Sequence, residues 1–148
     1  MNESHQTEIL LVEDSQDDLD MTLRALRKAN MANHISVARD GAEALDFIFG
    51  QGAHAARPIE HLPKLVMLDL KLPKIDGMEV LRRIKSDPRT KMIPVVMLTS
   101  SKEQKDVIES YGLGSNSYIV KPVDFEAFAD AVQKLGMYWL LLNQPPKL

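Results

Sequence analysis

Short apolar runs recur along the chain, each bounded by polar, proline or glycine residues. Two of these runs, 8–12 and 64–68, end directly before acidic side chains. A third, 92–98, precedes three hydroxyl-bearing residues, and a fourth, 117–120, precedes a lysine. The first three runs have the length and the flanking turn-forming residues that are typical of strands buried on both faces of a parallel sheet. The run 117–120 also predicts a strand. The alternating segment 34–38 predicts one further strand.

Apolar residues recur at helical spacing in the segments between these runs. Leu19, Leu23 and Leu26 share one face of a predicted helix of about four turns. Ser15 and Asp18 are placed to form a capping box at its start. A second helix is expected after Asp40-Gly41 and extends through 50–63 into a loop, and a third carries Met78 to Ile84 before Asp87-Pro88. A polar helix runs from about Lys102 to Tyr111 and is closed by Gly112 and Gly114. The last helix begins near Asp124 and has an apolar stripe from Phe125 to Trp139.

A strand followed by a helix therefore occurs five times in succession. This alternation predicts a doubly wound α/β fold, in which a five-stranded parallel sheet carries helices on both faces through right-handed crossovers. No repeat, linker or change of composition divides the 148 residues. We expect a single domain over 1–148 with no output domain, its core at about 8–135 and an extended C-terminal helix and tail over 136–148.

Composition and charge narrow the class of protein. The chain is 45% hydrophobic and 26% charged, as in ordinary soluble domains, and its net charge of −3 gives no electrostatic case for binding nucleic acid. It has no cysteine, which excludes disulfides and thiolate chemistry and fits a reducing compartment. The polar segment 1–8 lacks the apolar core of a signal peptide, and the apolar cluster 137–142 is too short to span a membrane. These features predict a soluble, cytoplasmic protein.

Acidic, hydroxyl and amino side chains follow the ends of four predicted strands. They are Glu13 and Asp14 after the first strand, Asp69 after the third, Thr99 after the fourth and Lys121 after the fifth. Because the carboxyl ends of parallel strands lie at one edge of a sheet, we expect these side chains to converge. Three crowded carboxylates favour a hard divalent cation such as Mg²⁺, and a lysine and a hydroxyl can hold the oxygens of a phosphoryl group. The combination indicates chemistry through an aspartyl phosphate.

This order of residues resembles the receiver domain of response regulators in two-component signalling, over nearly the whole chain. The resemblance also rests on Pro73, Gly77 and Pro122. It implies a flavodoxin-like fold with strand order 2-1-3-4-5. It implies that Asp69 is the phosphoacceptor and that Asp14, Asp69 and the Lys71 carbonyl bind Mg²⁺ or Mn²⁺, with Glu13 acting mostly through water. Thr99 and Lys121 would hold the phosphoryl oxygens, and Thr99 and Tyr118 would form the conformational switch. The peptide bond before Pro122 would be cis.

The resemblance implies a signalling protein rather than an enzyme with an external substrate. Such a protein would accept a phosphoryl group from a sensor histidine kinase, catalyse only its own phosphorylation and slow autodephosphorylation, and signal by protein contact or phosphorelay. Lys71 and Ser101 flank the expected path of attacking water, so we predict that they tune the lifetime of the phosphoryl group. A narrower resemblance, to the small stand-alone regulators that partner phytochrome-type histidine kinases, is carried by segments 50–63, 116–122 and 138–143.

The last predicted helix is apolar on every side near its end. From 137 to 142 nearly every residue is apolar, which is more than a single core-facing stripe can bury. The helix end can pack back over its own domain, or it can be buried against a second copy through the fourth helix, fifth strand and fifth helix. We favour a homodimer, with the interface candidates Tyr138, Trp139, Leu141 and Leu142.

Two other classes of function remain as alternatives. A phosphohydrolase of the haloacid-dehalogenase kind also forms an aspartyl phosphate, but it needs a second acid two residues after the nucleophile, where this chain has Lys71. A receiver-like scaffold that does not respond to phosphate would not need the acidic, hydroxyl and lysine positions that this chain retains. Both alternatives are weaker than the signalling receiver.

Overall fold

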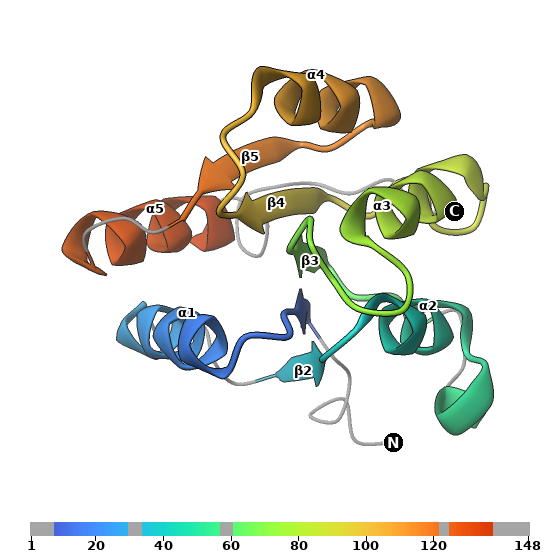
Figure 1. The fold of residues 1–148 in the computed structure, drawn as a ribbon. Coiled ribbons are helices and arrows are strands. Elements are labelled where there is room, and N and C mark those ends of the chain that lie inside the picture. Colours follow the sequence, from blue (N-terminus) through green and yellow to red (C-terminus); the bar gives the residue numbers. More distant parts are fainter. Residues whose placement is uncertain (1–7, 30–33, 57–60, 122–124, 138–148) are drawn as a thin grey trace.

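The structure is a computed structural model, and it describes residues 8–29, 34–56, 61–121 and 125–137 (Figure 1). Its described part contains a five-stranded sheet in the order β2-β1-β3-β4-β5, with every neighbouring pair parallel. The predicted fold class and strand order are therefore confirmed. The strands are β1 (Ile9–Val12), β2 (Ile35–Ala38), β3 (Leu65–Leu68), β4 (Val95–Thr99) and β5 (Ser117–Val120).

Helices cover both faces of this sheet, as Figure 1 shows. On one face α1 (Gln16–Lys28) packs against α5 (Phe125–Met137), and on the other lie α2 (Gly41–Phe49) and α3 (Gly77–Ser86). Successive strand residues point to opposite faces, so a strand covered on both sides must be apolar throughout. In β1, for example, Ile9 and Leu11 belong to the core beneath α1 and α5, whereas Leu10 and Val12 belong to the core beneath α2 and α3.

Helix α4 (Gln104–Leu113) is attached differently from the other helices. It lies beside α3 and β5, and its one fully buried residue is Ser110. Ile108 and Tyr111, which follow one another at helical spacing, are exposed. The apolar faces that hold the other helices to the sheet are thus largely missing from α4.

Three local expectations about element ends require correction. The helix before Gly50 does not extend through 50–63, because Gly50 takes a left-handed conformation (φ 63°) and a short 3-10 helix, η2 (Gly52–His54), follows. Helix α4 is closed by Gly114 (φ 108°) alone, since Gly112 is still helical. Strand β4 starts at Val95 instead of Met92; Pro94, which has no N–H to donate, directly precedes it.

The start of α1 follows the prediction in part. The Ser15 hydroxyl accepts a hydrogen bond from the Asp18 N–H (3.4 Å), so Ser15 is the N-cap. The reciprocal bond of a capping box is not made, because the Ser15 N–H donates to Glu13 Oε2 (3.2 Å) and the Asp18 carboxylate binds Lys121. The Ser15 N–H and the Asp18 carboxylate, which would bind each other in a capping box, therefore bind Glu13 and Lys121 instead.

The turn after β3 is closed by a tight backbone contact. The Gly77 N–H donates to the Leu70 carbonyl (2.7 Å), and a Cβ on Gly77 would lie 2.0 Å from the Asp69 carbonyl oxygen. Only glycine permits this approach. The contact fixes the backbone of Asp69 from the side of α3.

Some predictions fall outside the described residues. They are the cis peptide bond before Pro122 and the dimer candidates Tyr138, Trp139, Leu141 and Leu142. Within the described residues, no helix combines the length and the apolar character that crossing a membrane requires.

Candidate phosphoacceptor and metal site

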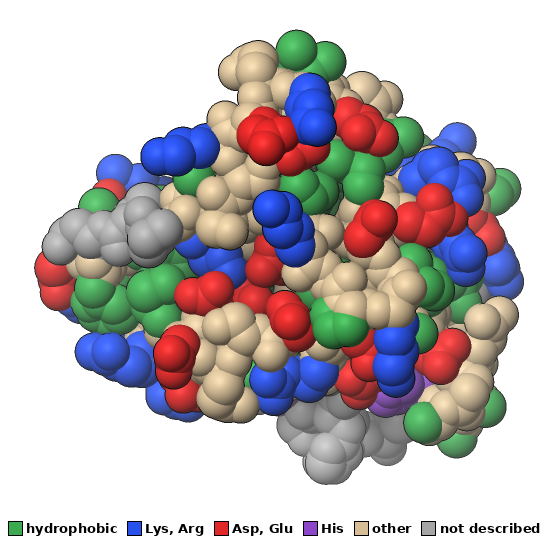
Figure 2. All heavy atoms as spheres, in the orientation of Figure 1, with side chains coloured by type: hydrophobic (Ala, Val, Ile, Leu, Met, Phe, Trp, Pro, Cys, Tyr) green, Lys and Arg blue, Asp and Glu red, His purple; other side chains and the backbone are tan. Residues whose placement is uncertain are grey.

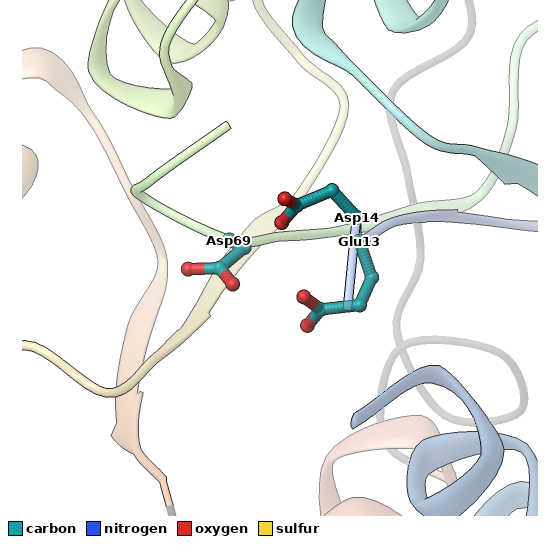
Figure 3. Close-up of side chains that lie close together, drawn as sticks. All are labelled: Glu13, Asp14 and Asp69. Carbon is teal, nitrogen blue, oxygen red and sulfur yellow. The ribbon is translucent and has the colours of Figure 1, made fainter. Parts of the chain in front are cut away.

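Three carboxylates converge where β1 and β3 end (Figure 3). Val12 and Leu68 are register partners on adjacent parallel strands, and the Asp69 N–H donates to the Val12 carbonyl (3.1 Å), so Glu13, Asp14 and Asp69 emerge side by side. One ligand oxygen from each lies within 4.8 Å of the others. Glu13 and Asp69 are buried, whereas Asp14 is exposed. Carboxylate oxygens held this closely fit a hard divalent cation.

Lys121 supplies the positive charge in this cluster. Its Nζ lies 2.6 Å from Glu13 Oε1, 2.9 Å from Asp18 Oδ2 and 3.4 Å from Asp69 Oδ2. Lys121 follows β5, and β4 lies between β5 and β3, so its side chain reaches past one strand to the acids. The lysine is 3% exposed, so its ion pairs are little screened by solvent.

Burial and neighbouring charges set the protonation of these groups. Burial raises the pKa of Glu13 from 4.5 to about 7, and the charge of Asp69 adds to the effect, whereas the hydrogen bond from Lys121 opposes it. Burial alone would lower the pKa of Lys121, but its bonds to Glu13 and Asp18 outweigh burial and the pKa is raised. Lys121 is therefore an ammonium at neutral pH, and Glu13 is a poorly solvated acid beside it.

We expect Glu13 to make the stability of the metal-free protein fall as the pH rises from about 4.5 to about 7. In this window the folded state holds a proton on Glu13 that the unfolded state has released, so raising the pH favours unfolding. The Glu13→Gln variant keeps an oxygen acceptor for Lys121 but has no proton to lose. Urea unfolding in the presence of a chelator should show the stability difference between wild type and variant changing across the window by on the order of 2 kcal/mol. Parallel pH profiles for the two proteins would contradict the expectation.

The candidate switch residues are linked through Ser101. Thr99 is fully buried at the end of β4, and its Oγ1 accepts a hydrogen bond from the Ser101 N–H (3.4 Å). The Tyr118 hydroxyl donates to the Ser101 carbonyl (2.8 Å), and burial raises the pKa of Tyr118, so this hydroxyl stays protonated. The Ser101 hydroxyl in turn donates to Asp106 in α4 (2.6 Å). A tuning role for Ser101 stays a prediction; the structure connects its side chain to α4.

Lys71 contributes through its backbone and borders an open groove. Its N–H donates to Asp69 Oδ1 (3.3 Å), while its side chain is exposed. The groove, of about 770 Å³, runs between the β3–α3 loop and α4 and reaches Asp14. Figure 2 shows acidic side chains gathered in the middle of this face of the molecule, where β1 and β3 lie in Figure 1. Of the three clustered acids, Asp14 lines this groove.

Arg39 is a residue of the site that sequence reasoning missed. It directly follows β2, and its guanidinium donates to the backbone carbonyls of Glu13 (3.0 Å) and Asp14 (2.8 Å) and to Gln16 Oε1 (3.1 Å). The guanidinium therefore holds the acidic loop by its backbone and leaves both carboxylates available. The available signal was an arginine immediately after the strand that pairs with β1 in this strand order.

The sequence of residues 9–133 matches the family model described as the response regulator receiver domain. The chain belongs to this family. Its resemblance to receiver domains, including those of phytochrome-associated regulators, is thereby confirmed, and with it the class of protein: a receiver in two-component signalling.

Three relatives illustrate the likeness. The response regulator Rcp1 of Synechocystis sp. is 41% identical over 132 residues, which span 89% of this chain and 88% of the relative, and a crystal structure of its Mn²⁺-bound form superposes with a TM-score of 0.82. The bacteriophytochrome response regulator AtBRR is 53% identical, with 92% of this chain and 96% of the relative covered and a TM-score of 0.74. The phosphorylated cyanobacterial phytochrome response regulator RcpA is 37% identical, with 97% and 99% covered and a TM-score of 0.85.

Proposed function

We propose that this chain is a receiver that accepts a phosphoryl group from a sensor histidine kinase on Asp69 and passes the signal on by protein contact or phosphorelay. The observation that carries the proposal is the position of the Lys121 ammonium, 3.4 Å from Asp69 Oδ2 within a cluster of three carboxylates. A cation beside one acid would be an ordinary ion pair. A buried cation shared among several acids, one of them beside a groove-lining aspartate, is suited to hold the oxygens of an incoming phosphoryl group.

Glu13, Asp14 and Asp69, with the Lys71 carbonyl, are the groups that we propose hold Mg²⁺ or Mn²⁺. The donor set consists of oxygens only, which is what these ions prefer, and the relative Rcp1 is described as Mn²⁺-bound. When bound, the ion supplies positive charge that offsets the repulsion between the phosphoryl group and the carboxylates.

The residues of the chain then have distinct roles in the transfer. A carboxylate oxygen of Asp69 forms a bond to phosphorus as the bond from phosphorus to the donor's imidazole nitrogen breaks, and that nitrogen keeps the electron pair. The Lys121 ammonium neutralises charge on the phosphoryl oxygens, and the Thr99 hydroxyl donates a hydrogen bond to them. Once Thr99 turns toward the phosphoryl group, its bond from the Ser101 N–H is lost. Because Ser101 is also hydrogen-bonded to Tyr118 in β5 and to Asp106 in α4, losing this bond would alter the contacts of both elements.

Incubation with acetyl phosphate and Mg²⁺ tests the proposal. We expect intact-mass spectrometry to show the gain of a single phosphoryl group, which disappears on treatment with hydroxylamine because an acyl phosphate is cleaved by this nucleophile. A chelator should suppress the gain. No incorporation would favour a scaffold that does not respond to phosphate, and a hydroxylamine-stable adduct would place the phosphoryl group on a hydroxyl. Rapid release of inorganic phosphate over many cycles would favour the phosphohydrolase alternative, against which Lys71 at the second position after Asp69 already argues.

The names of the relatives suggest which kinase supplies the phosphoryl group. AtBRR and RcpA are described as regulators of bacteriophytochrome and cyanobacterial phytochrome systems, so we propose a phytochrome-type histidine kinase as the donor, acting in the cytoplasm. Homodimerisation through the C-terminal segment stays a prediction, because its candidate residues lie outside the described part of the chain.

A further inference from the structure

The Lys121 ammonium has one partner that does not belong to the candidate metal cluster. Of the three carboxylates around it, Glu13 and Asp69 are candidate metal ligands, whereas Asp18 is not. An ammonium has three N–H donors, and these three acids use them all. A cation drawn into the cluster would compete with Lys121 for Glu13 and Asp69. Asp18 is then the one of these three carboxylates for which the bound cation does not compete with Lys121.

Asp18 is fixed by the helix that carries it. It lies in the first turn of α1, where its N–H donates to the Ser15 hydroxyl (3.4 Å) and its carbonyl accepts a hydrogen bond from the Thr22 hydroxyl (2.8 Å). The helix itself packs along α5, where the Arg24 guanidinium lies over the Phe125 ring at 4.5 Å. Holding a flexible lysine side chain in one conformation costs considerable side-chain entropy. A carboxylate on a rigid helix can offset that cost and keep the lysine in place.

We propose that Asp18 is a positioning residue, which holds the Lys121 ammonium beside Asp69 so that one N–H remains directed at the phosphoryl group. The inference rests on the proposed function. Before transfer the three N–H groups bind Glu13, Asp18 and Asp69; after transfer a phosphoryl oxygen replaces the Asp69 oxygen while Asp18 keeps its bond. Asp18 does not belong to the candidate metal cluster of Glu13, Asp14 and Asp69, and its bond from Lys121 is the contact through which we expect it to act.

A general effect of acidic residues at a helix start is the competing explanation. Acids in the first turn of a helix are favoured by its dipole whatever else they contact. Asp17 provides the matched control, because it lies in the same turn, carries the same charge and is exposed. An effect that comes from Lys121 will appear at position 18 and not at position 17.

The test compares Asp18→Ala, Asp18→Asn and Asp17→Ala with wild type in two measurements. The first is the rate of phosphorylation by acetyl phosphate as a function of Mg²⁺. The second is the affinity for trifluoroberyllate, a phosphoryl mimic, followed by ¹⁹F NMR. We expect Asp18→Ala to lower both the rate at saturating Mg²⁺ and the affinity about tenfold, the loss that one charge-assisted hydrogen bond predicts. Asp18→Asn, which keeps an oxygen acceptor, should lose less. The Mg²⁺ concentration for half-maximal rate should stay within about twofold of wild type in both variants, because Asp18 is outside the cluster.

Three results would overturn the inference: unchanged rates and affinities in both Asp18 variants, an equal loss in Asp17→Ala, or a loss that higher Mg²⁺ fully restores. If Asp18→Ala does not fold, as judged by circular dichroism, Asp18→Asn decides alone, because asparagine keeps the size of aspartate and removes only the charge that binds Lys121. Failure of the proposed function would look different. In that case wild type itself would take up no hydroxylamine-labile phosphoryl group.

Discussion

The Asp69→Asn variant is expected to take up no hydroxylamine-labile phosphoryl group from acetyl phosphate, a loss of at least about 10³-fold in rate. Asparagine has nearly the same shape as aspartate, but its amide oxygen carries no formal charge and is a poor nucleophile. The substitution also removes a candidate metal ligand and one acid from the partners of Lys121. Intact-mass spectrometry over time with saturating Mg²⁺ measures the rate.

Asp76→Asn is the matched control for this experiment. Asp76 borders the same groove and undergoes the same chemical change, and its main contact is the cap of α3, where its Oδ1 accepts a hydrogen bond from the Glu79 N–H (3.0 Å). Asparagine is an equally good cap, so phosphorylation should stay within about twofold of wild type. Uptake by Asp69→Asn at a rate near that of wild type would place the phosphoacceptor elsewhere.

Replacing Lys121 by methionine is expected to destabilise the metal-free protein by about 3 kcal/mol at neutral pH. Methionine fills much of the lysine's volume but leaves Glu13 and Asp69 buried without a cation. The rate of phosphorylation should also fall about 100-fold, because no ammonium then neutralises the phosphoryl oxygens. Urea unfolding in the presence of a chelator measures the first effect, and acetyl phosphate labelling measures the second.

Acidification should lessen the stability loss in Lys121→Met. Below about pH 7 the folded protein holds a proton on Glu13, so removing the ammonium exposes less unbalanced charge at pH 5 than at pH 7.5. The control is Lys64→Met, because Lys64 is half exposed and its nearest acid, Glu8, lies 3.8 Å away. We expect that substitution to change stability by about 0.5 kcal/mol or less at either pH. A pH-independent loss in Lys121→Met would show that packing, and not charge, accounts for it.

The sequence predicts the centre of this fold well because two strong constraints coincide there. A strand buried on both faces must be apolar throughout, so 8–12 and 64–68 stand out without any knowledge of their partners. Parallel strands then bring their carboxyl ends to one edge, so Glu13, Asp14 and Asp69 could be placed together before their distances were known.

The contacts of Asp18 and Arg39 could not be predicted in the same way. A local pattern correctly assigns Ser15 as a cap, but it also assigns the Asp18 carboxylate to that cap, whereas the structure gives it to Lys121. That outcome depends on how α1 is rotated about its axis relative to the end of β5, which involves residues 103 positions apart. Arg39 likewise connects the segments that follow two neighbouring strands, β2 and β1, and it binds backbone carbonyls, which a pattern of side chains does not reveal.

The ends of helices could not be predicted from the sequence for a different reason. Gly112 and Gly114 are equivalent as sequence signals for the end of a helix. In the structure only Gly114 adopts the left-handed conformation that ends α4, and its neighbour Ser115 bonds back to the helix through the Ser110 carbonyl (2.9 Å). The choice between two nearby glycines is therefore made by hydrogen bonds to groups that the sequence does not locate.

The polar attachment of α4 gives this helix an unusual thermodynamic character. Asp106 accepts a hydrogen bond from the Ser101 hydroxyl (2.6 Å), whereas the hydroxyl bonds of the buried Ser110 stay within the helix and its end. Ile108 and Tyr111 are already exposed to water. Leu113 is the apolar residue by which α4 packs against the core, so detaching α4 would expose less apolar surface than detaching a core helix. We therefore expect its opening to have a smaller heat-capacity change and a weaker dependence on denaturant. The core helices must expose apolar faces to leave the sheet. We therefore expect α4 to open locally at a lower free-energy cost than the core helices.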